Sequence, residues 1–114
     1  MKNYTSYDLI EWGKPFEKSQ HALPEPTLSE VLIRVTAAGL CHSDLHVQKG
    51  YMDLGEEGRL TFAERGAQLP MTFGHEIAGF VEAVGDKVKN VSIGQQVLVF
   101  PWIGCGDCLA CNED

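Results

Sequence analysis

Three of the four cysteines lie close together near the C-terminal end of the chain, as Cys105, Cys108 and Cys111. This double Cys-x-x-Cys spacing can aim three thiolates at one tetrahedral zinc ion. A closed zinc site needs a fourth ligand, and residues 112–114 include no cysteine. The site is therefore complete only if the natural chain continues or a carboxylate substitutes. Free loop thiols or a redox Cys-x-x-Cys pair are the alternatives, but three cysteines at this spacing favour zinc.

A second set of metal-ligand types combines Cys41 with the later pair His75 and Glu76. Thiolate, neutral imidazole and carboxylate are the ligand types that zinc accepts, and a catalytic zinc site leaves one position for water or substrate. Each residue alone is weak evidence, because an isolated cysteine or histidine is usually a core or hydrogen-bonded residue. Together they predict a catalytic zinc site. Asp44 could fix the tautomer of His75 by binding its far nitrogen, or could simply cap a helix.

Short strands separated by turns must position these candidate ligands. Apolar alternation and β-branched residues predict strands at residues 31–36, 77–84 and 97–100, and a further strand is possible at residues 4–10. This pattern, with little helix, suggests a compact β-barrel or sandwich rather than a doubly wound sheet. We therefore expect a mainly β domain.

One short helix is expected over residues 41–48, directly after the strand at 31–36. The segment lacks strand alternation and contains Ser43 and Asp44, which are favourable residues at a helix start. A helix here places Ser43 and His46 on one face. Residues 51–68 are rich in glycine and charge with weak periodicity, and we expect a long surface loop with at most one helical turn.

Composition limits the classes of partner and compartment. The 114 residues fit one domain, and the net charge of −7 argues against binding to nucleic acid or to an anionic membrane surface. No apolar stretch approaches the length of a membrane span, and the first residues lack the apolar run of a signal peptide. We expect a cytoplasmic protein, in which the thiol pool keeps cysteines reduced and available for metal binding or catalysis.

The motifs together resemble those of zinc-containing medium-chain alcohol dehydrogenases. The resemblance rests on Cys-x-Ser-Asp-x-His from Cys41, on Gly-His-Glu at 74–76 and on the three-cysteine loop, and it spans nearly the whole chain. Gly85 with Asp86, and Gly94, also occur in the order expected for that family. The resemblance implies a GroES-like, partly open β-barrel with one or two short helices and a cysteine-rich zinc lobe at its C-terminal end.

The resemblance also implies roles for residues in the first cluster. Cys41 and His75 would bind the catalytic zinc, and Glu76 would be the acidic residue that enters during ligand exchange, while the family's third standing ligand lies further downstream. Ser43 would take the proton of the substrate alcohol. His46 would pass that proton to water through the cofactor ribose.

The resemblance implies further roles for residues on both sides of the first cluster. His42 stands where relatives place Arg or His against the cofactor pyrophosphate, although an exposed helix residue would look the same. Cys105, Cys108 and Cys111 match three of the four cysteines of the structural zinc lobe, whose last cysteine would fall just beyond Asp114. Trp102 could line the substrate pocket, or serve only as a core or surface residue.

The complete enzyme is expected to oxidise an alcohol to an aldehyde or ketone by hydride transfer to NAD or NADP. That step needs a dinucleotide-binding βαβ unit, and the only similar glycine pair, Gly104 and Gly106, has Leu109 where the third glycine should fall. We therefore expect residues 1–114 to form an incomplete GroES-like domain without the Rossmann domain, able to bind zinc but inactive alone. The resemblance implies a homo-oligomer, either a dimer or a tetramer, for the complete enzyme.

Three other interpretations remain open at this point. The first is a non-catalytic interaction module with a GroES-like fold that uses zinc only for structure, although structural sites are normally closed by four ligands. The second is a chaperonin-like assembly partner, which leaves the cysteine and histidine placement unexplained. The third is a zinc-free reductase of the same superfamily, which would not need Cys41, His75 or Glu76.

Overall fold

The computed structural model describes residues 2–113 and is mainly β, with two short α-helices and one 3₁₀ helix. The elements follow the order β1 (Asn3–Leu9), β2 (Glu17–Ala22), β3 (Val31–Gly39), α1 (His42–Lys49), β4 (Tyr51–Asp53), η1 (Gly55–Glu57), β5 (Arg59–Thr61), β6 (Met71–Thr72), β7 (Glu76–Val84), β8 (Gln96–Val99) and α2 (Leu109–Asn112).

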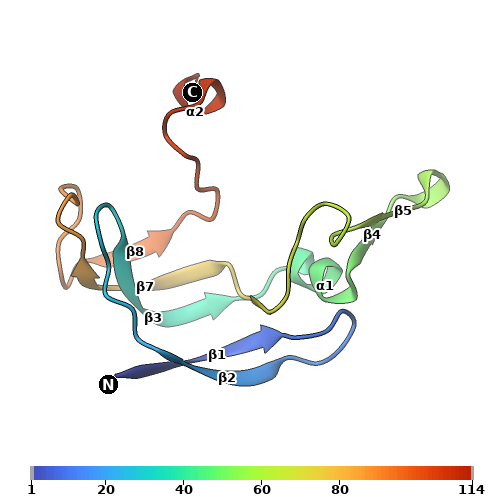
Figure 1. Cartoon of the computed structure of the whole chain (residues 1–114), viewed down its shortest axis with the longest axis horizontal. Helices are drawn as coiled ribbons and strands as arrows, with labels where there is room; N and C mark the ends of the chain where they lie inside the picture. Colours follow the sequence, from blue (N-terminus) through green and yellow to red (C-terminus); the bar gives the residue numbers. More distant parts are fainter. Residues whose placement is uncertain (1, 114) are drawn as a thin grey trace.

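Two open three-stranded sheets and a separate hairpin make up the fold (Figure 1). One sheet has the order β2-β1-β6 and the other the order β3-β7-β8, and all their pairings are antiparallel. The expected mainly β architecture is confirmed, and its two sheets are open. The four predicted strands are confirmed as β1, β3, β7 and β8, with β3 running three residues beyond its predicted end at residue 36.

The long strands β3 and β7 form the frame on which both halves of the first cluster are mounted. Their register pairs Gly39 with Glu76, so the chain leaves β3 for Cys41 beside the point where His75 leads into β7. Gly79 keeps this pairing close, because a Cβ there would collide with the carbonyl oxygen of Arg34. Antiparallel pairing thus brings together two segments that are far apart in the sequence.

The helix at the end of β3 begins and ends close to its predicted bounds. Cys41 is the N-cap in extended conformation, with φ −106° and ψ 176°, rather than Ser43 or Asp44. Gly50 ends the helix with φ 89°, in the left-handed region that glycine reaches without strain. The capping position therefore holds the Cys41 backbone rigidly at the helix start.

The segment 51–68 is not simply a loop, and in this respect the sequence-based prediction is wrong. β4 and β5 pair antiparallel from Tyr51↔Thr61 to Asp53↔Arg59, with the 3₁₀ helix η1 at the tip. The Arg59 guanidinium lies 4.3 Å from the Tyr51 ring centre across this pair. Short strands of three residues carry too little alternation to be recognised. Strand β6, with two residues, was missed for the same reason, and β2 was missed because its sequence, EKSQHA, has no apolar alternation.

A buried carboxylate ties the first sheet together. Asp8, 3% exposed, accepts hydrogen bonds from the hydroxyls of Ser6 at 2.9 Å and Thr72 at 2.6 Å, and lies 3.3 Å from His21 Nε2. These partners come from β1, β6 and β2. The Thr72 hydroxyl, with smaller contributions from Ser19, Ser6 and His21, overcomes the opposing effect of burial and lowers the pKa of Asp8 to about 2.

This cluster should control how the stability of the fold decreases at acid pH. A carboxyl group whose pKa is depressed in the folded state stabilises the fold above its unfolded pKa near 3.8, and this stabilisation disappears as the pH falls toward 2. We expect Asp8→Asn to remove about 2 kcal/mol at neutral pH and to flatten the loss of stability between pH 4 and 2. Urea unfolding at several pH values tests this, and an acid limb unchanged in the variant would contradict it.

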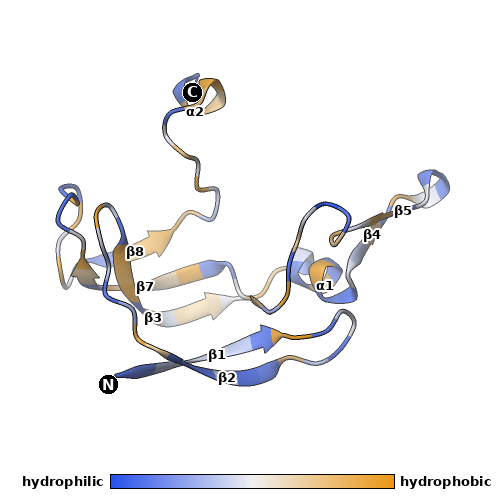
Figure 2. Cartoon of the chain, in the orientation of Figure 1, coloured by the Kyte–Doolittle hydropathy of each residue, from blue (hydrophilic) through white to orange (hydrophobic). Residues whose placement is uncertain are grey.

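Few apolar side chains are fully buried among the described residues. Only Leu9 and Val81 count as buried hydrophobic core, whereas Leu98 and Phe100 at and after β8 are 83% and 74% exposed. Figure 2 shows this apolar character on β8 and the adjoining β7. Among residues 2–113, no helix is long and apolar enough to cross a membrane.

Candidate metal centres

The structure brings Cys41, His75 and Asp44 into one cluster. Their potential ligand atoms lie within 4.8 Å of one another, and Cys41 Sγ is 3.2 Å from His75 Nε2. Cys41 lies at the start of α1, and His75 lies between β6 and β7. Gly74, with φ 90° and its Cα facing Ala38, permits the sharp turn that directs His75 toward Cys41.

Asp44 orients both ligands at once. Its Oδ2 accepts the Cys41 backbone N–H at 3.0 Å, and its Oδ1 lies 3.2 Å from His75 Nδ1. The side chain is only 7% exposed, so both contacts are shielded from water. Capping the helix and holding His75 were alternatives in the sequence, and the structure shows that one carboxylate makes both contacts.

The contact with Asp44 selects the tautomer of His75. An ionised carboxylate only accepts hydrogen bonds, so His75 Nδ1 carries a proton, and a metal ion would bind the lone pair of Nε2 on the side of Cys41 Sγ. A tetrahedral zinc ion with Zn–S of about 2.3 Å and Zn–N of about 2.0 Å holds such atoms about 3.5 Å apart. The observed 3.2 Å needs only a small opening, so the pair fits a shared zinc ion.

Local electrostatics favour the metal-binding form of the thiol. The Ser43 hydroxyl, and to a smaller extent the backbone N–H groups of Ser43 and Asp44 and the His75 charge, lower the pKa of Cys41 against the effect of burial. For His75, burial lowers the pKa, but the charges and hydrogen bonds of Asp44 and Cys41 together raise it. Since the thiolate is the metal ligand, these effects prepare Cys41 for coordination.

Glu76 is placed apart from this cluster. It is exposed at the start of β7, and the group of Cys41, Asp44 and His75 does not include it. Its carboxylate lies over Gly39, where an added Cβ would come within 2.5 Å of Glu76 Oε2. The absence of a side chain at Gly39 therefore provides the space that Glu76 occupies, a role for Gly39 that the sequence did not reveal.

The other residues predicted on α1 surround Cys41. Ser43 is exposed, and its hydroxyl is the largest cause of the lowered pKa of the Cys41 thiol. His42 is exposed, and its ring contacts that of the half-buried His46 edge to face, with 4.7 Å between centroids. One helical turn thus carries a hydroxyl beside the thiol and two imidazoles in contact with each other.

The three-cysteine lobe forms a second cluster. Cys111 Sγ lies 3.9 Å from Cys105 Sγ and 3.5 Å from Cys108 Sγ, and all three thiols are free. Sulfur atoms around a tetrahedral zinc ion are about 3.8 Å apart, whereas a disulfide requires about 2.0 Å. The spacing fits zinc coordination and excludes a disulfide in this arrangement.

Two local features prepare the lobe for a cation. The backbone N–H of Asp107, followed by that of Cys108 and the neighbouring thiols, lowers the pKa of Cys105 to about 7. Gly104 leaves room for the third sulfur, because a Cβ at this position would come within 2.6 Å of Cys111 Sγ. We assigned Gly104 no such role from the sequence, because the role depends on which side chain fills the space beside it.

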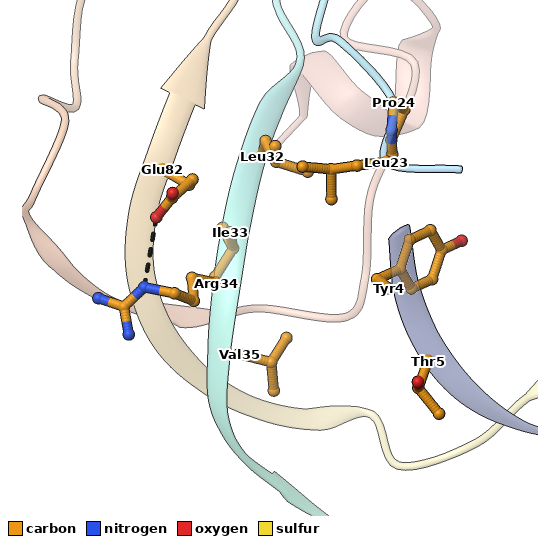
Figure 3. Close-up of a pocket in the computed structure, with 9 residues that line it drawn as sticks. All are labelled: Tyr4, Thr5, Leu23, Pro24, Leu32, Ile33, Arg34, Val35 and Glu82. Atoms are coloured by element: carbon orange, nitrogen blue, oxygen red, sulfur yellow. Dashed lines mark hydrogen bonds and ion pairs between the residues drawn. The ribbon is translucent and has the colours of Figure 1, made fainter. Parts of the chain in front are cut away.

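Trp102 is exposed, and a groove between the two sheets contains none of the predicted site residues. Trp102 is 82% exposed on the segment between β8 and the lobe. A groove of about 520 Å³ opens between the two sheets, and Figure 3 shows the Arg34–Glu82 ion pair beside it. Its lining consists of Tyr4, Thr5, Leu23, Pro24, Leu32, Ile33, Arg34, Val35 and Glu82. None of the predicted site residues lines this groove, so it is separate from both metal-type clusters.

Comparison with known proteins agrees with this arrangement. Residues 27–114 match the alcohol dehydrogenase GroES-like domain family. An NAD-dependent alcohol dehydrogenase of Sulfurisphaera tokodaii is 46% identical over 105 residues, which are 91% of this chain and 29% of the relative. The chain therefore spans less than a third of the length of this curated relative.

Solved structures give the same assignment. Benzyl alcohol dehydrogenase from Acinetobacter calcoaceticus superposes with a TM-score of 0.77 at 31% identity, covering 98% of this chain and 27% of that one. An alcohol dehydrogenase zinc-binding domain protein from Burkholderia ambifaria gives a TM-score of 0.77 at 35% identity, covering 97% and 26%. The chain belongs to the alcohol dehydrogenase GroES-like domain family.

Proposed function

We propose that this chain is the N-terminal catalytic-domain portion of a zinc-dependent enzyme that oxidises an alcohol to an aldehyde or ketone with NAD or NADP. The observation that carries the proposal is the 3.2 Å separation of Cys41 Sγ and His75 Nε2, with Asp44 bound to the opposite nitrogen of His75. A thiol and an imidazole nitrogen at this distance are a donor pair that zinc accepts, and the contact with Asp44 is the kind that orients a zinc-bound histidine. The pair is therefore interpreted as two ligands of a catalytic zinc ion.

Zinc held there would act as a Lewis acid that makes an alcohol hydroxyl more acidic, and the nicotinamide would accept hydride. Among the residues of this chain, Asp44 keeps His75 in the ligating tautomer, and the Ser43 hydroxyl lies beside Cys41, where it can receive the alcohol proton. His46, three residues further along α1, would pass that proton toward water. The exposed Glu76 would enter only during ligand exchange.

The cofactor would be held mainly outside this sequence. Hydride transfer needs a dinucleotide beside the zinc site, and we propose that a separate nucleotide-binding domain supplies it, with His42 of this chain approaching the pyrophosphate. The relative from Sulfurisphaera tokodaii, which is described as NAD-dependent and is over three times longer than the matched region, supports this division. The substrate would be a small alcohol or carbonyl compound, with Trp102 near its pocket, and the complete protein would be a homo-oligomer in the cytoplasm.

The lobe would hold a second zinc ion with a structural role. Cys105, Cys108 and Cys111 supply three thiolates at suitable separations, and a fourth ligand would come from a residue outside the described part of the chain. We expect Cys108→Ser in the complete protein to lower the zinc content by one ion per chain and to lower the melting temperature. Elemental analysis together with calorimetry tests this, and two retained zinc ions per chain would contradict it.

The proton path offers a test that separates this enzyme from a zinc-binding module without catalysis. In the complete protein, we expect Ser43→Ala to reduce kcat by about 100-fold or more, because general acid–base transfer contributes about 10² to 10⁴. His46→Gln should reduce kcat less and weaken its dependence on pH. Leu45→Ala is the matched control on the same helix, where its side chain is exposed.

Steady-state kinetics across the pH range would measure both changes, with zinc content measured on the same samples. If Ser43→Ala and His46→Gln oxidise alcohols as fast as the unaltered protein while retaining zinc, the proton path is wrong. A protein without any alcohol oxidation would instead favour the interaction module.

A further inference from the structure

Helix α1 carries two histidines whose rings meet on one face. His42 and His46 are four residues apart, which places them on the same side of a helix one turn above each other. Their ring centroids are 4.7 Å apart and their planes cross at 71°. Neither ring belongs to the cluster of Cys41, Asp44 and His75. The pair is therefore a separate arrangement of nitrogen donors beside the first centre.

The separation of the rings matches that of two imidazoles on one metal ion. With a metal–nitrogen bond of about 2.0 Å, the ion lies about 3.2 Å from each ring centre, and ligand angles of about 90° to 110° place the centres about 4.5 to 5.2 Å apart. The observed 4.7 Å falls within this range. At this separation of the ring centres, rotation of each ring about its side-chain bonds can turn a nitrogen of each histidine toward one ion.

The chemistry and access of the pair also suit a cation. Imidazole nitrogen is a good ligand for Zn²⁺, Cu²⁺ and Ni²⁺, and two histidines at this spacing on a helix form one of the recurring zinc-binding patterns. His42 is exposed and His46 half-buried, so an ion from solvent can reach both rings. The net charge of −7 attracts cations to the chain as a whole.

We propose that His42 and His46 form a second, exchangeable site for a divalent transition metal, distinct from the Cys41–His75 centre. Two imidazoles supply the protein ligands and water completes the coordination. One consequence rests on the proposed function. An ion bound to both rings prevents His46 from transferring the proton and prevents His42 from contacting the cofactor. Excess Zn²⁺ therefore inhibits alcohol oxidation.

The direct test is a calorimetric titration of Zn²⁺ into the complete protein, after elemental analysis shows that its cysteine sites are loaded. The expected result is one additional weak binding event per chain. His42→Asn and His46→Asn should each weaken it by about tenfold or more, because a single remaining imidazole loses the advantage of chelation. His21→Asn, at a histidine on the other sheet, is the matched control and should bind the extra ion normally.

A second measurement does not depend on variants. One equivalent of Cu²⁺ added to the zinc-loaded protein should give an electron paramagnetic resonance spectrum with splitting from two imidazole nitrogens. Splitting from one nitrogen, no additional binding of Zn²⁺, or unchanged binding by His42→Asn and His46→Asn would overturn the site.

Turnover measured during the same zinc titration separates the site from the proposed function. Inhibition that follows occupancy of the additional site, and that the control His21→Asn retains, supports both. Occupancy without inhibition supports the metal site and contradicts the roles assigned to His42 and His46 in catalysis.

Discussion

Replacing Cys41 by alanine should reduce alcohol oxidation by the complete protein at least about 1,000-fold. The variant removes one of the two ligands that this chain offers to the catalytic zinc, and Lewis-acid stabilisation of the transition state is worth several kcal/mol, or about tenfold for each 1.4 kcal/mol. The fold should be retained, since Cys41 is free of disulfides and its backbone N–H keeps its hydrogen bond to Asp44 in the variant. Steady-state kinetics, zinc analysis and circular dichroism together measure these effects.

The exposed Leu45 on the same helix again provides the control, and Leu45→Ala should retain both activity and zinc. The Cys41→Ala protein should contain one zinc ion per chain fewer than the control. If that protein oxidises alcohol at the full rate, Cys41 is not a ligand of the catalytic metal.

Replacing Asp44 by asparagine should weaken zinc binding at the first centre by about 10- to 100-fold with little effect on the helix cap. The amide oxygen can still accept the Cys41 N–H, which directs the amide NH₂ toward His75 Nδ1. His75 must then accept at Nδ1 and carry its proton on Nε2, the nitrogen that faces Cys41 Sγ. The lone pair that would bind the metal is therefore lost.

Asp44→Ala serves as the comparison because it removes both contacts. It should weaken zinc binding and also cost about 0.5 to 2 kcal/mol of folding stability through the lost cap. Competition with a chromophoric chelator gives the zinc affinity, and urea unfolding gives the stability. Equal zinc affinity in Asp44→Asn and the unaltered protein would show that the tautomer of His75 does not control binding.

The longer elements were predictable because their signals are periodic. Strands β3 and β7 of nine residues each carry enough apolar and β-branched positions to be recognised, and α1 has clear start residues. The hairpin of β4 and β5 was not predictable, because three-residue strands rich in charge do not alternate. Their pairing depends on the turn at η1 and on the contact of Arg59 with Tyr51.

The candidate site was predictable in its residue types but not in its arrangement. Spacing could nominate Cys41, His75 and Asp44, since each has a side chain suited to a zinc site. Only the register of β3 and β7 shows that the cysteine and histidine meet. The roles of Gly39 and Gly104 could not be found in the sequence, because they depend on which side chain fills the space that each glycine leaves.

Anomalous X-ray scattering at the zinc absorption edge, from crystals of the complete protein loaded with zinc, tests the central claim most directly. A shared ion should give a peak within bonding distance of both Cys41 Sγ and His75 Nε2, at about 2.3 Å and 2.0 Å. A zinc-loaded crystal without a peak between these two atoms would contradict the assignment of a catalytic metal centre to this chain.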